Sequence, residues 1–307
     1  MKIKTSLSSN AQLWFDEENY KSTELYHNIN DEQRSLIDEM HTNGFIVIKN
    51  SVKNSLIDEA LEFEKSWIAA NKLQYESNRK PDGTPPRIVD FHRESNKISK
   101  LFTENKSLEI QDIMFQARTS IYTSLFFATS TQQPMHRDVP VFCTSPYNFY
   151  FGMWVALEDT TIENGALKVY RSGHKAHVDQ YAIPKKLGIE YFDIPQQHTD
   201  LWNEYQSQVE SKCMELNLEI VTVNLDKGDT VIWHPLLPHS GGKIIKEGAT
   251  RHSIVFHTVP EGVPVYRSNV FFNPHSRFPT SRSRFSYSSL EHKRVTADFG
   301  NCKLRNK

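Results

Sequence analysis

The spacing of hydrophobic residues changes along the chain and separates a helical part from a strand-rich part. Residues 30–44 begin with the capping candidates Asn30 and Asp31, carry apolar residues three or four positions apart, and end at Gly44. This pattern predicts a helix, and the run FIVI after it predicts a strand. Residues 55–72 predict a second amphipathic helix.

Short apolar runs dominate the sequence after about residue 118. Turn residues separate these runs, which are rich in aromatic and β-branched side chains and therefore predict strands. They cover residues 119–130, 139–144, 148–159, 165–172, 218–225, 229–234 and 251–259. Between them, residues 197–217 predict a helical insert. Residues 74–100 are polar, contain three prolines and one glycine, and predict a long surface loop.

Helices first and many short strands afterwards predict a mostly β fold. We expect a jelly roll (a double-stranded, cupin-like β-helix) with flanking N-terminal helices and a helical insert. No change in composition marks a linker, so residues 1–307 are expected to form a single domain. Its core would cover about 118–260, with a helical part at 1–117 and a basic C-terminal tail at 274–307.

Composition and charge narrow the classes of partner. The chain has 307 residues, 38% of them hydrophobic, and a net charge of −1, which predicts binding to neither nucleic acid nor membranes. Its beginning lacks the apolar core of a signal peptide, and no apolar run is long enough to cross a membrane. Three sparse cysteines predict reduced thiols and a cytoplasmic location. The oligomeric state stays open.

A histidine followed two positions later by an acidic residue occurs four times, so this spacing alone has little value. The pairs are His92/Glu94, His136/Asp138, His177/Asp179 and His198/Asp200. Asp200 is expected to cap the helical insert. Only the second pair has strand-like runs on both sides, and residues two apart on a strand share a face. With a second histidine, His234 or His239, this pair would form the two-histidine, one-carboxylate set of non-haem Fe(II) oxygenases. The alternative is two polar residues at a strand end.

Several ordered motifs extend this pattern. HRD (136–138) is followed by Trp154, 18 residues after the first histidine, then by NGALKVYRSGHK (164–175) and GDTVIWHPLLPH (228–239). An arginine, Arg251, comes about a dozen residues later. In these motifs the chain resembles the phytanoyl-CoA 2-hydroxylase family of Fe(II)- and 2-oxoglutarate-dependent oxygenases.

The resemblance implies roles for individual residues. His136, Asp138 and His239, rather than His234, would bind Fe(II). Arg251, placed within a strand, would anchor the far carboxylate of the cosubstrate 2-oxoglutarate, and Trp154 would line the cosubstrate pocket.

The chain departs from the family pattern after the distal histidine. The family has a serine that contacts the cosubstrate at the position of Gly241, whereas here Ser240 comes one place early. Ser253, two residues after the arginine, is an alternative contact. Residues close to the HRD motif are candidates to face the substrate, although packing roles are equally open: Arg137, Phe142, Tyr147 and Asn148.

The activity implied by this resemblance is hydroxylation of a small-molecule metabolite with consumption of O2 and release of succinate and CO2. A protein-modifying hydroxylase and a catalytically silent binding barrel are the alternatives. The tail at 274–307 carries eight Lys/Arg against two Asp/Glu. We interpret it either as a solvated, partly mobile segment or as an element that attracts an anionic substrate.

Overall fold

The computed structural model describes residues 12–276, 286–298 and 301–305. These residues form a nine-stranded sheet, a three-stranded sheet and a short two-stranded ribbon. In the large sheet the order is β1–β8–β5–β10–β3–β13–β12, and β3 also pairs with β2, which pairs with β14. Its strands are β1 (Phe45–Ile48), β2 (Arg87–Val89), β3 (Thr119–Phe127), β5 (Phe151–Ala156), β8 (Thr230–Trp233), β10 (Ser253–Pro260), β12 (Tyr287–Ser289), β13 (Val295–Ala297) and β14 (Lys303–Arg305).

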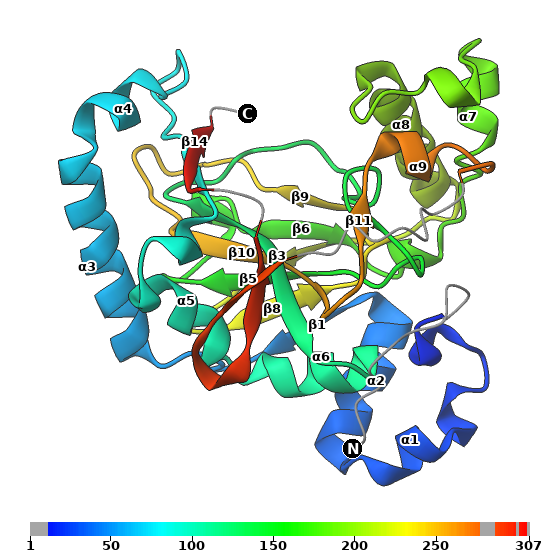
Figure 1. The fold of residues 1–307 in the computed structure, drawn as a ribbon, viewed down its shortest axis with the longest axis horizontal. Helices are drawn as coiled ribbons and strands as arrows, with labels where there is room; N and C mark the ends of the chain where they lie inside the picture. Colours follow the sequence, from blue (N-terminus) through cyan, green and yellow to red (C-terminus); the bar gives the residue numbers. More distant parts are fainter. Residues whose placement is uncertain (1–11, 277–285, 299–300, 306–307) are drawn as a thin grey trace.

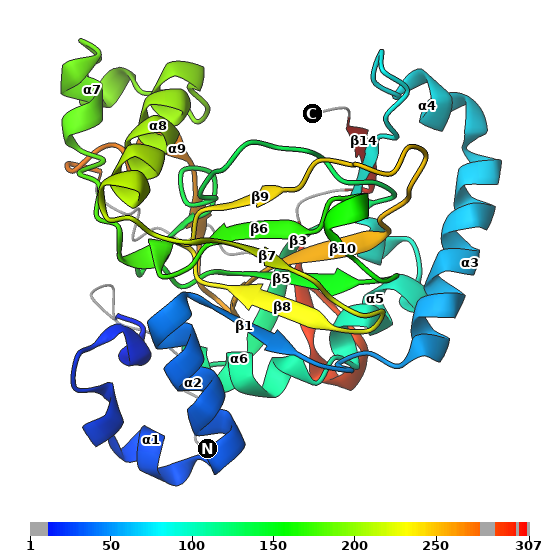
Figure 2. The same ribbon diagram turned by 180° about the vertical axis from the view of Figure 1, so that it is seen from behind.

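The small sheet has the order β7–β6–β9, and the ribbon pairs β11 with β4. Figure 2 shows the small sheet lying over the central strands of the large one. The strands are β4 (Cys143–Thr144), β6 (Leu167–Tyr170), β7 (Ile220–Val223), β9 (His239–Gly241) and β11 (Val265–Tyr266).

Side chains alternate between the two faces of the large sheet, as the pleat requires. Residues on the inner face pack against the small sheet, and their neighbours in sequence pack beneath the helices on the outer face. The inner set includes Trp154, Val231 and Val255, and the outer set includes Met153, Ile232 and Ile254. This two-sheet core is the predicted jelly roll, and that prediction is confirmed.

Helices surround the sheets on three sides (Figure 1). Both views show α3 along one flank, α1 and α2 at the base, and α7 to α9 grouped at the opposite upper corner. The helices are α1 (Glu24–Asn28), α2 (Asp31–Asn43), α3 (Asn54–Ala70), α4 (Lys72–Ser77), α5 (Asn96–Thr103), α6 (Ser107–Phe115), α7 (Ala182–Lys186), α8 (Thr199–Glu215) and α9 (Ser268–Phe271). Among the described residues, no helix has the length and apolarity needed to cross a membrane.

The predicted helix before β1 is confirmed, including both of its ends. Asn30 caps α2: its side chain accepts from the N–H of Gln33 at 2.8 Å, and the Gln33 side chain accepts in return from the Asn30 N–H. Gly44 ends the helix with φ of 80°, in the left-handed region. A β-carbon at Gly44 would lie 2.4 Å from His174, so the close approach also requires glycine.

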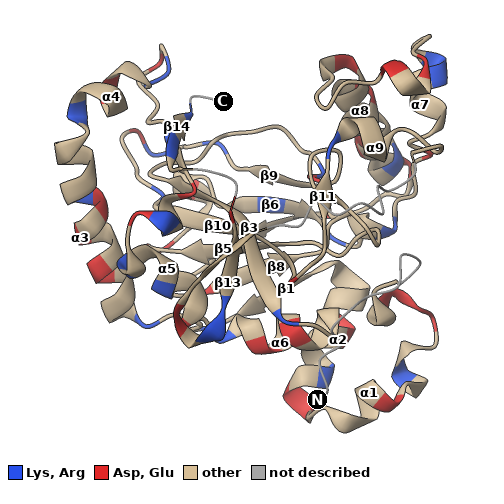
Figure 3. Ribbon diagram, in the orientation of Figure 1, with Lys and Arg blue, Asp and Glu red and all other residues tan. Residues whose placement is uncertain are grey.

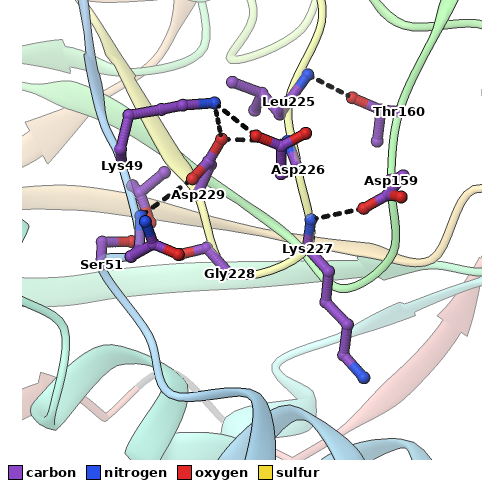
Figure 4. A network of polar contacts seen from close by, with 11 residues as sticks. Lys49, Ser51, Asp159, Thr160, Leu225, Asp226, Lys227, Gly228 and Asp229 are labelled. Atoms are coloured by element: carbon purple, nitrogen blue, oxygen red, sulfur yellow. Dashed lines mark hydrogen bonds and ion pairs between the residues drawn. The ribbon is translucent and has the colours of Figure 1, made fainter.

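The GD pair of the GDTVIW motif forms a turn that attaches β1 to β8 (Figure 4). The Asp229 carboxylate accepts from the backbone N–H of Asn50 at 2.9 Å and of Asp226 at 2.9 Å, and pairs with Lys49. Ser51 donates to the carbonyl of Gly228 at 2.9 Å. The motif therefore fixes the start of β8, the strand that leads toward His239.

Three local predictions are wrong. Residues 74–100 are not a loop throughout, because β2 and the start of α5 lie within them. β2 was missed because its two apolar residues, Ile88 and Val89, are too few to show the alternation typical of a strand. Residues 139–144 yield only β4, since the chain turns after Asp138, whose carbonyl accepts from the N–H groups of Val141 and Phe142. The cap of α8 is His198, with Asp200 already inside the first turn.

The basic C-terminal segment is largely structured where it is described. β13 pairs in parallel with β3, and β14 extends the sheet beyond β2. These strands are therefore ordered parts of the sheet and not a mobile segment, while Lys303 and Arg305 of β14 are exposed to solvent. Residues 277–285, 299–300 and 306–307 of this segment lie outside the described residues.

Candidate metal centre and active-site cavity

Three of the predicted site residues come together in the barrel interior. The candidate ligand atoms of His136, Asp138 and His239 lie within 4.8 Å of one another. The Asp138 carboxylate is 3.5 Å from Nε2 of His136 and 3.6 Å from Nε2 of His239. Backbone pairing produces this approach, because each histidine donates its N–H to the carbonyl of the other at 2.9 Å. We call these three residues the His-Asp-His cluster.

Hydrogen bonds fix the orientation of both imidazole rings. Nδ1 of His136 lies 2.8 Å from the carbonyl oxygen of Pro134, and Nδ1 of His239 lies 3.0 Å from that of Leu237. A carbonyl accepts only, so Nδ1 of each ring carries the proton. In the neutral ring, Nε2 therefore keeps its lone pair and faces Asp138. Burial lowers the pKa of His239 to about 4, which keeps that ring neutral.

The Asp138 carboxyl is ionised despite its burial. Burial alone would raise its pKa, but the positive charge that His239 and His136 carry when protonated outweighs that effect and holds the pKa below its usual range. Two imidazole lone pairs and one carboxylate converge on one point. This donor set fits a divalent transition metal, and the backbone carbonyls behind the rings are the outer partners such sites use.

His234 lies apart from this cluster. It follows β8 directly, and its Nε2 is 3.1 Å from the Asp16 carboxylate of the N-terminal segment. Its Nδ1 accepts from the N–H of Leu236 at 3.1 Å, and its ring packs against His174. Both ring nitrogens therefore have partners outside the barrel interior.

A cavity of about 540 Å³ opens beside the cluster. All three cluster residues line it. Among the other predicted site residues, those that line it are Phe142, Trp154, Ser240 and Arg251. Those that do not are Arg137, Tyr147, Asn148 and Ser253.

Arg251 is a buried cation that stacks on an aromatic wall of the cavity. Its guanidinium lies 5.2 Å from the ring centroid of Trp154 and donates to the carbonyl of Gly165. Burial lowers its pKa to about 10, and its Nε has no partner among the described residues. Arg251 precedes β10 by two residues instead of lying within the strand, contrary to the prediction, but its N–H still bonds to Ala128.

The two serine candidates differ in position. Ser240 lines the cavity, whereas Ser253 does not, and the Ser253 hydroxyl donates to the Arg251 carbonyl at 3.5 Å. A β-carbon at Gly241 would lie 3.0 Å from the Thr131 hydroxyl, which also lines the cavity. Thr131 therefore fills the space that a serine side chain at position 241 would need.

The predicted substrate-facing role of Arg137 does not match its position. Its guanidinium donates to the carbonyls of Gly173 and Ala176, both at 2.7 Å, and so ties that turn to the HRD segment. The Tyr147 hydroxyl lies 3.2 Å from that of Tyr181, outside the cavity. Asn148 occupies a turn with φ of 65° and lies away from the cavity as well.

A hydrogen-bonded chain behind the cluster was not predicted. The buried Tyr150 hydroxyl donates to the Asp138 carboxylate at 2.7 Å and lies 2.6 Å from Nδ1 of His257. Its single proton goes to the carboxylate, so His257 donates to the tyrosine oxygen. Nε2 of His257 is left buried and without a partner among the described residues, in a ring that lines the cavity. Burial lowers the pKa of His257 to about 4.

Three further arginines line the cavity and were also missed: Arg87, Arg267 and Arg305. Arg87 comes from the segment predicted as a loop. Arg305 comes from the basic segment, whose composition was the one signal that pointed to it.

A jelly roll with two histidines and one carboxylate facing an internal cavity is the arrangement of the non-haem iron oxygenase class. The chain belongs to the phytanoyl-CoA dioxygenase (PhyH) family, whose model matches residues 40–253.

Curated relatives carry the same family name. Human "Phytanoyl-CoA dioxygenase, peroxisomal" is 25% identical over 239 residues, which is 71% of this chain and 64% of that protein. A "Probable phytanoyl-CoA dioxygenase" of Caenorhabditis elegans is 28% identical over 119 residues, covering 39% of this chain and 34% of that protein.

Solved structures with the same fold include two that contain ligands. The epimerase SnoN, in complex with Fe3+, alpha ketoglutarate and nogalamycin RO, has a TM-score of 0.58 at 15% identity, covering 88% of this chain and 96% of that chain. EctD from S. alaskensis with 2-oxoglutarate and 5-hydroxyectoine has a TM-score of 0.53 at 13% identity and covers 76% of each chain. These likenesses establish the fold.

Proposed function

We propose that the protein is an Fe(II)- and 2-oxoglutarate-dependent dioxygenase that hydroxylates a small-molecule metabolite and releases succinate and CO2. The observation that carries this proposal is the His-Asp-His cluster, with both Nε2 atoms directed at one carboxylate beside a cavity. Family membership and the iron and 2-oxoglutarate named for structural neighbours support it.

The cluster residues would hold Fe(II) through Nε2 of His136, the Asp138 carboxylate and Nε2 of His239. Bound iron would supply the oxidising chemistry, together with 2-oxoglutarate and O2. Arg251 would bind the far carboxylate of 2-oxoglutarate, because a buried guanidinium without a carboxylate partner presents several donors to an anion. Trp154 would hold that guanidinium by stacking, and Ser240 and Thr131 would supply hydroxyl groups.

The primary substrate in this proposal is a small molecule that carries negative charge. The excess of arginines over carboxylates along the cavity supports a charged substrate, and the cavity volume suits a metabolite. A reducing compartment such as the cytoplasm is proposed from the three cysteines, all of them free.

Anaerobic titration with Fe(II) and then with 2-oxoglutarate tests the proposal. The wild-type protein is expected to bind one Fe(II) and to develop a weak visible band as 2-oxoglutarate is added. His239→Ala should lose most of the iron affinity. His234→Ala is the matched control, since that histidine has partners outside the cluster, and it should retain iron and band. Loss of iron in His234→Ala with retention in His239→Ala would contradict the ligand assignment.

A further inference from the structure

The cavity contains more positive charge than the metal and cosubstrate require. Apart from Arg251, it is lined by Arg87, Arg267 and Arg305, and within the described chain none of the three forms an ion pair with a carboxylate. Among the described residues, two carboxylates line it. One is Asp138 of the cluster. The other, Asp90, already accepts from the Thr123 hydroxyl at 2.6 Å and the Ser124 N–H at 3.2 Å.

Two of these arginines face each other across paired strands. In the register of β2 and β14, Arg87 lies opposite Arg305. Like charges directly opposite one another destabilise a sheet unless something neutralises them. Burial and the guanidinium of Arg305 both lower the pKa of Arg87, whose Nε is buried without a partner in the described residues. Arg267, in contrast, donates to the carbonyl of Val141 at 3.0 Å.

The arginine pair lies where the main cavity meets a side chamber of about 390 Å³. The two spaces share five lining residues: Arg87, Phe127, Thr131, Gln133 and Arg305. Lys80 adds a third cation to the side chamber, and no carboxylate of the described part of the chain lines it. Figure 3 shows basic residues on β14, which closes this side of the sheet. An anion between the two guanidiniums would be accessible from the chamber and would still face the main cavity.

We propose that Arg87 and Arg305 bind an oxyanion group, a carboxylate or a phosphate, of the primary substrate. This inference rests on the proposed function and deepens it: the negative charge of the substrate lies at the β2–β14 edge, and the carbon to be oxidised lies toward the cluster. Two guanidiniums supply planar, multiple donors that match either oxyanion. Arg251 remains for the cosubstrate.

The test uses inorganic phosphate and acetate as probes, titrated by calorimetry into the protein loaded with Fe(II) and saturated with 2-oxoglutarate under anaerobic conditions. Arg87→Ala and Arg305→Ala should each weaken binding of the preferred anion about tenfold or more, the factor that follows from losing a charged hydrogen bond. Arg171→Ala, which changes an exposed arginine outside both cavities, is the control and should bind as wild type. Tighter binding of phosphate would indicate a phosphate group in the substrate, and tighter binding of acetate would indicate a carboxylate.

Single substitutions serve better than truncation, because removing residues 286–307 would delete β12, β13 and β14 from the large sheet. Arg305→Lys offers a second, conservative variant that should restore binding partly. Anion binding that is absent in wild type, or equal in all variants, would overturn the proposal. Weakened 2-oxoglutarate binding in Arg87→Ala with unchanged anion binding would assign the pair to the cosubstrate instead.

Failure of the proposed function has a different signature. It would appear as a wild-type protein without Fe(II) or 2-oxoglutarate binding. The same calorimetric titration on the metal-free protein would still measure whether the arginine pair binds the anion.

Discussion

Single side chains acquire their roles here from hydrogen-bond partners distant in sequence. Asp138 receives one such bond from Tyr150, and Tyr150 in turn receives one from His257. The carboxylate is thereby held in one orientation before any metal arrives. Partners of this kind contribute to metal affinity because they orient the ligand and satisfy its second oxygen.

Tyr150→Phe tests this contribution. The change removes one hydroxyl and leaves the ring, so the fold should persist while Fe(II) affinity falls about tenfold, the low end for loss of an outer-shell partner. Competition with a chelator under anaerobic conditions measures the affinity. Tyr147→Phe is the matched control, because that hydroxyl points to Tyr181 outside the cavity. Equal affinities in all three proteins would show that Tyr150 does not position Asp138.

Arg251→Ala tests the cosubstrate anchor. Leaving a buried carboxylate without its cation costs at least about 3 kcal/mol, so the 2-oxoglutarate requirement should rise by about a hundredfold or more. Arg251→Lys should recover only part of this, since an ammonium cannot form the two-pronged contact. The visible band of the anaerobic Fe(II) complex reports binding. Superimposable titrations would remove Arg251 from the site.

At the scale of elements, α3 brings a carboxyl group into the outer core of the large sheet. Glu64 is buried there, and its carboxylate lies 3.4 Å from Nε2 of His252, the residue before β10. Burial raises the pKa of Glu64 to about 7, and His252 offsets this only in part. The helix therefore packs best when this carboxyl is protonated.

A raised carboxyl pKa gives a defined sign of pH dependence. The folded state holds the Glu64 proton up to about pH 7, whereas the unfolded state releases it near its ordinary value, so stability falls as pH rises between the two. Glu64→Gln keeps the neutral shape. The free energy of unfolding of Glu64→Gln minus that of the wild type should therefore increase between pH 4.5 and pH 7.5, by at most about 3 kcal/mol.

Urea denaturation at several pH values measures this difference. Glu62→Gln, an exposed change on the same helix, should show no such gain. The interpretation of Glu64 is wrong if the two variants have the same pH profile.

At the scale of the whole molecule, both ends of the described chain contribute to the large sheet. Leu13, Phe15 and α2 pack with Phe151 and Ile232 on its outer face, and the C-terminal strands β13 and β14 pair with β3 and β2. Unfolding of either end of the described chain would therefore expose part of the core of the large sheet.

We therefore expect one cooperative thermal transition. The calorimetric enthalpy should equal the van't Hoff enthalpy within error, as for two-state unfolding. Two separate transitions, or a calorimetric enthalpy well above the van't Hoff value, would divide the chain into independent domains. The measurement thus tests the prediction that residues 1–307 form a single domain.

The sequence by itself determined the elements that short-range patterns encode. The sequence predicted the helix between Asn30 and Gly44 and the β-rich middle of the chain, because capping and pleat alternation are local properties. It also predicted that His136 and Asp138, two positions apart, point to the same side of the chain. The family resemblance then distinguished His239 from His234. Spacing alone could not, since both follow the same strand.

The tertiary structure decided which polar residues meet. Arg87 and Arg305 oppose each other only because β14 returns to pair with β2, and Tyr150 reaches Asp138 and His257 only when the barrel closes. Arg137, adjacent to the cluster in sequence, turns away because a neighbouring residue on an extended chain points to the opposite face. Contacts between distant segments depend on which strands pair, and the hydrophobic pattern of one strand does not specify its partner.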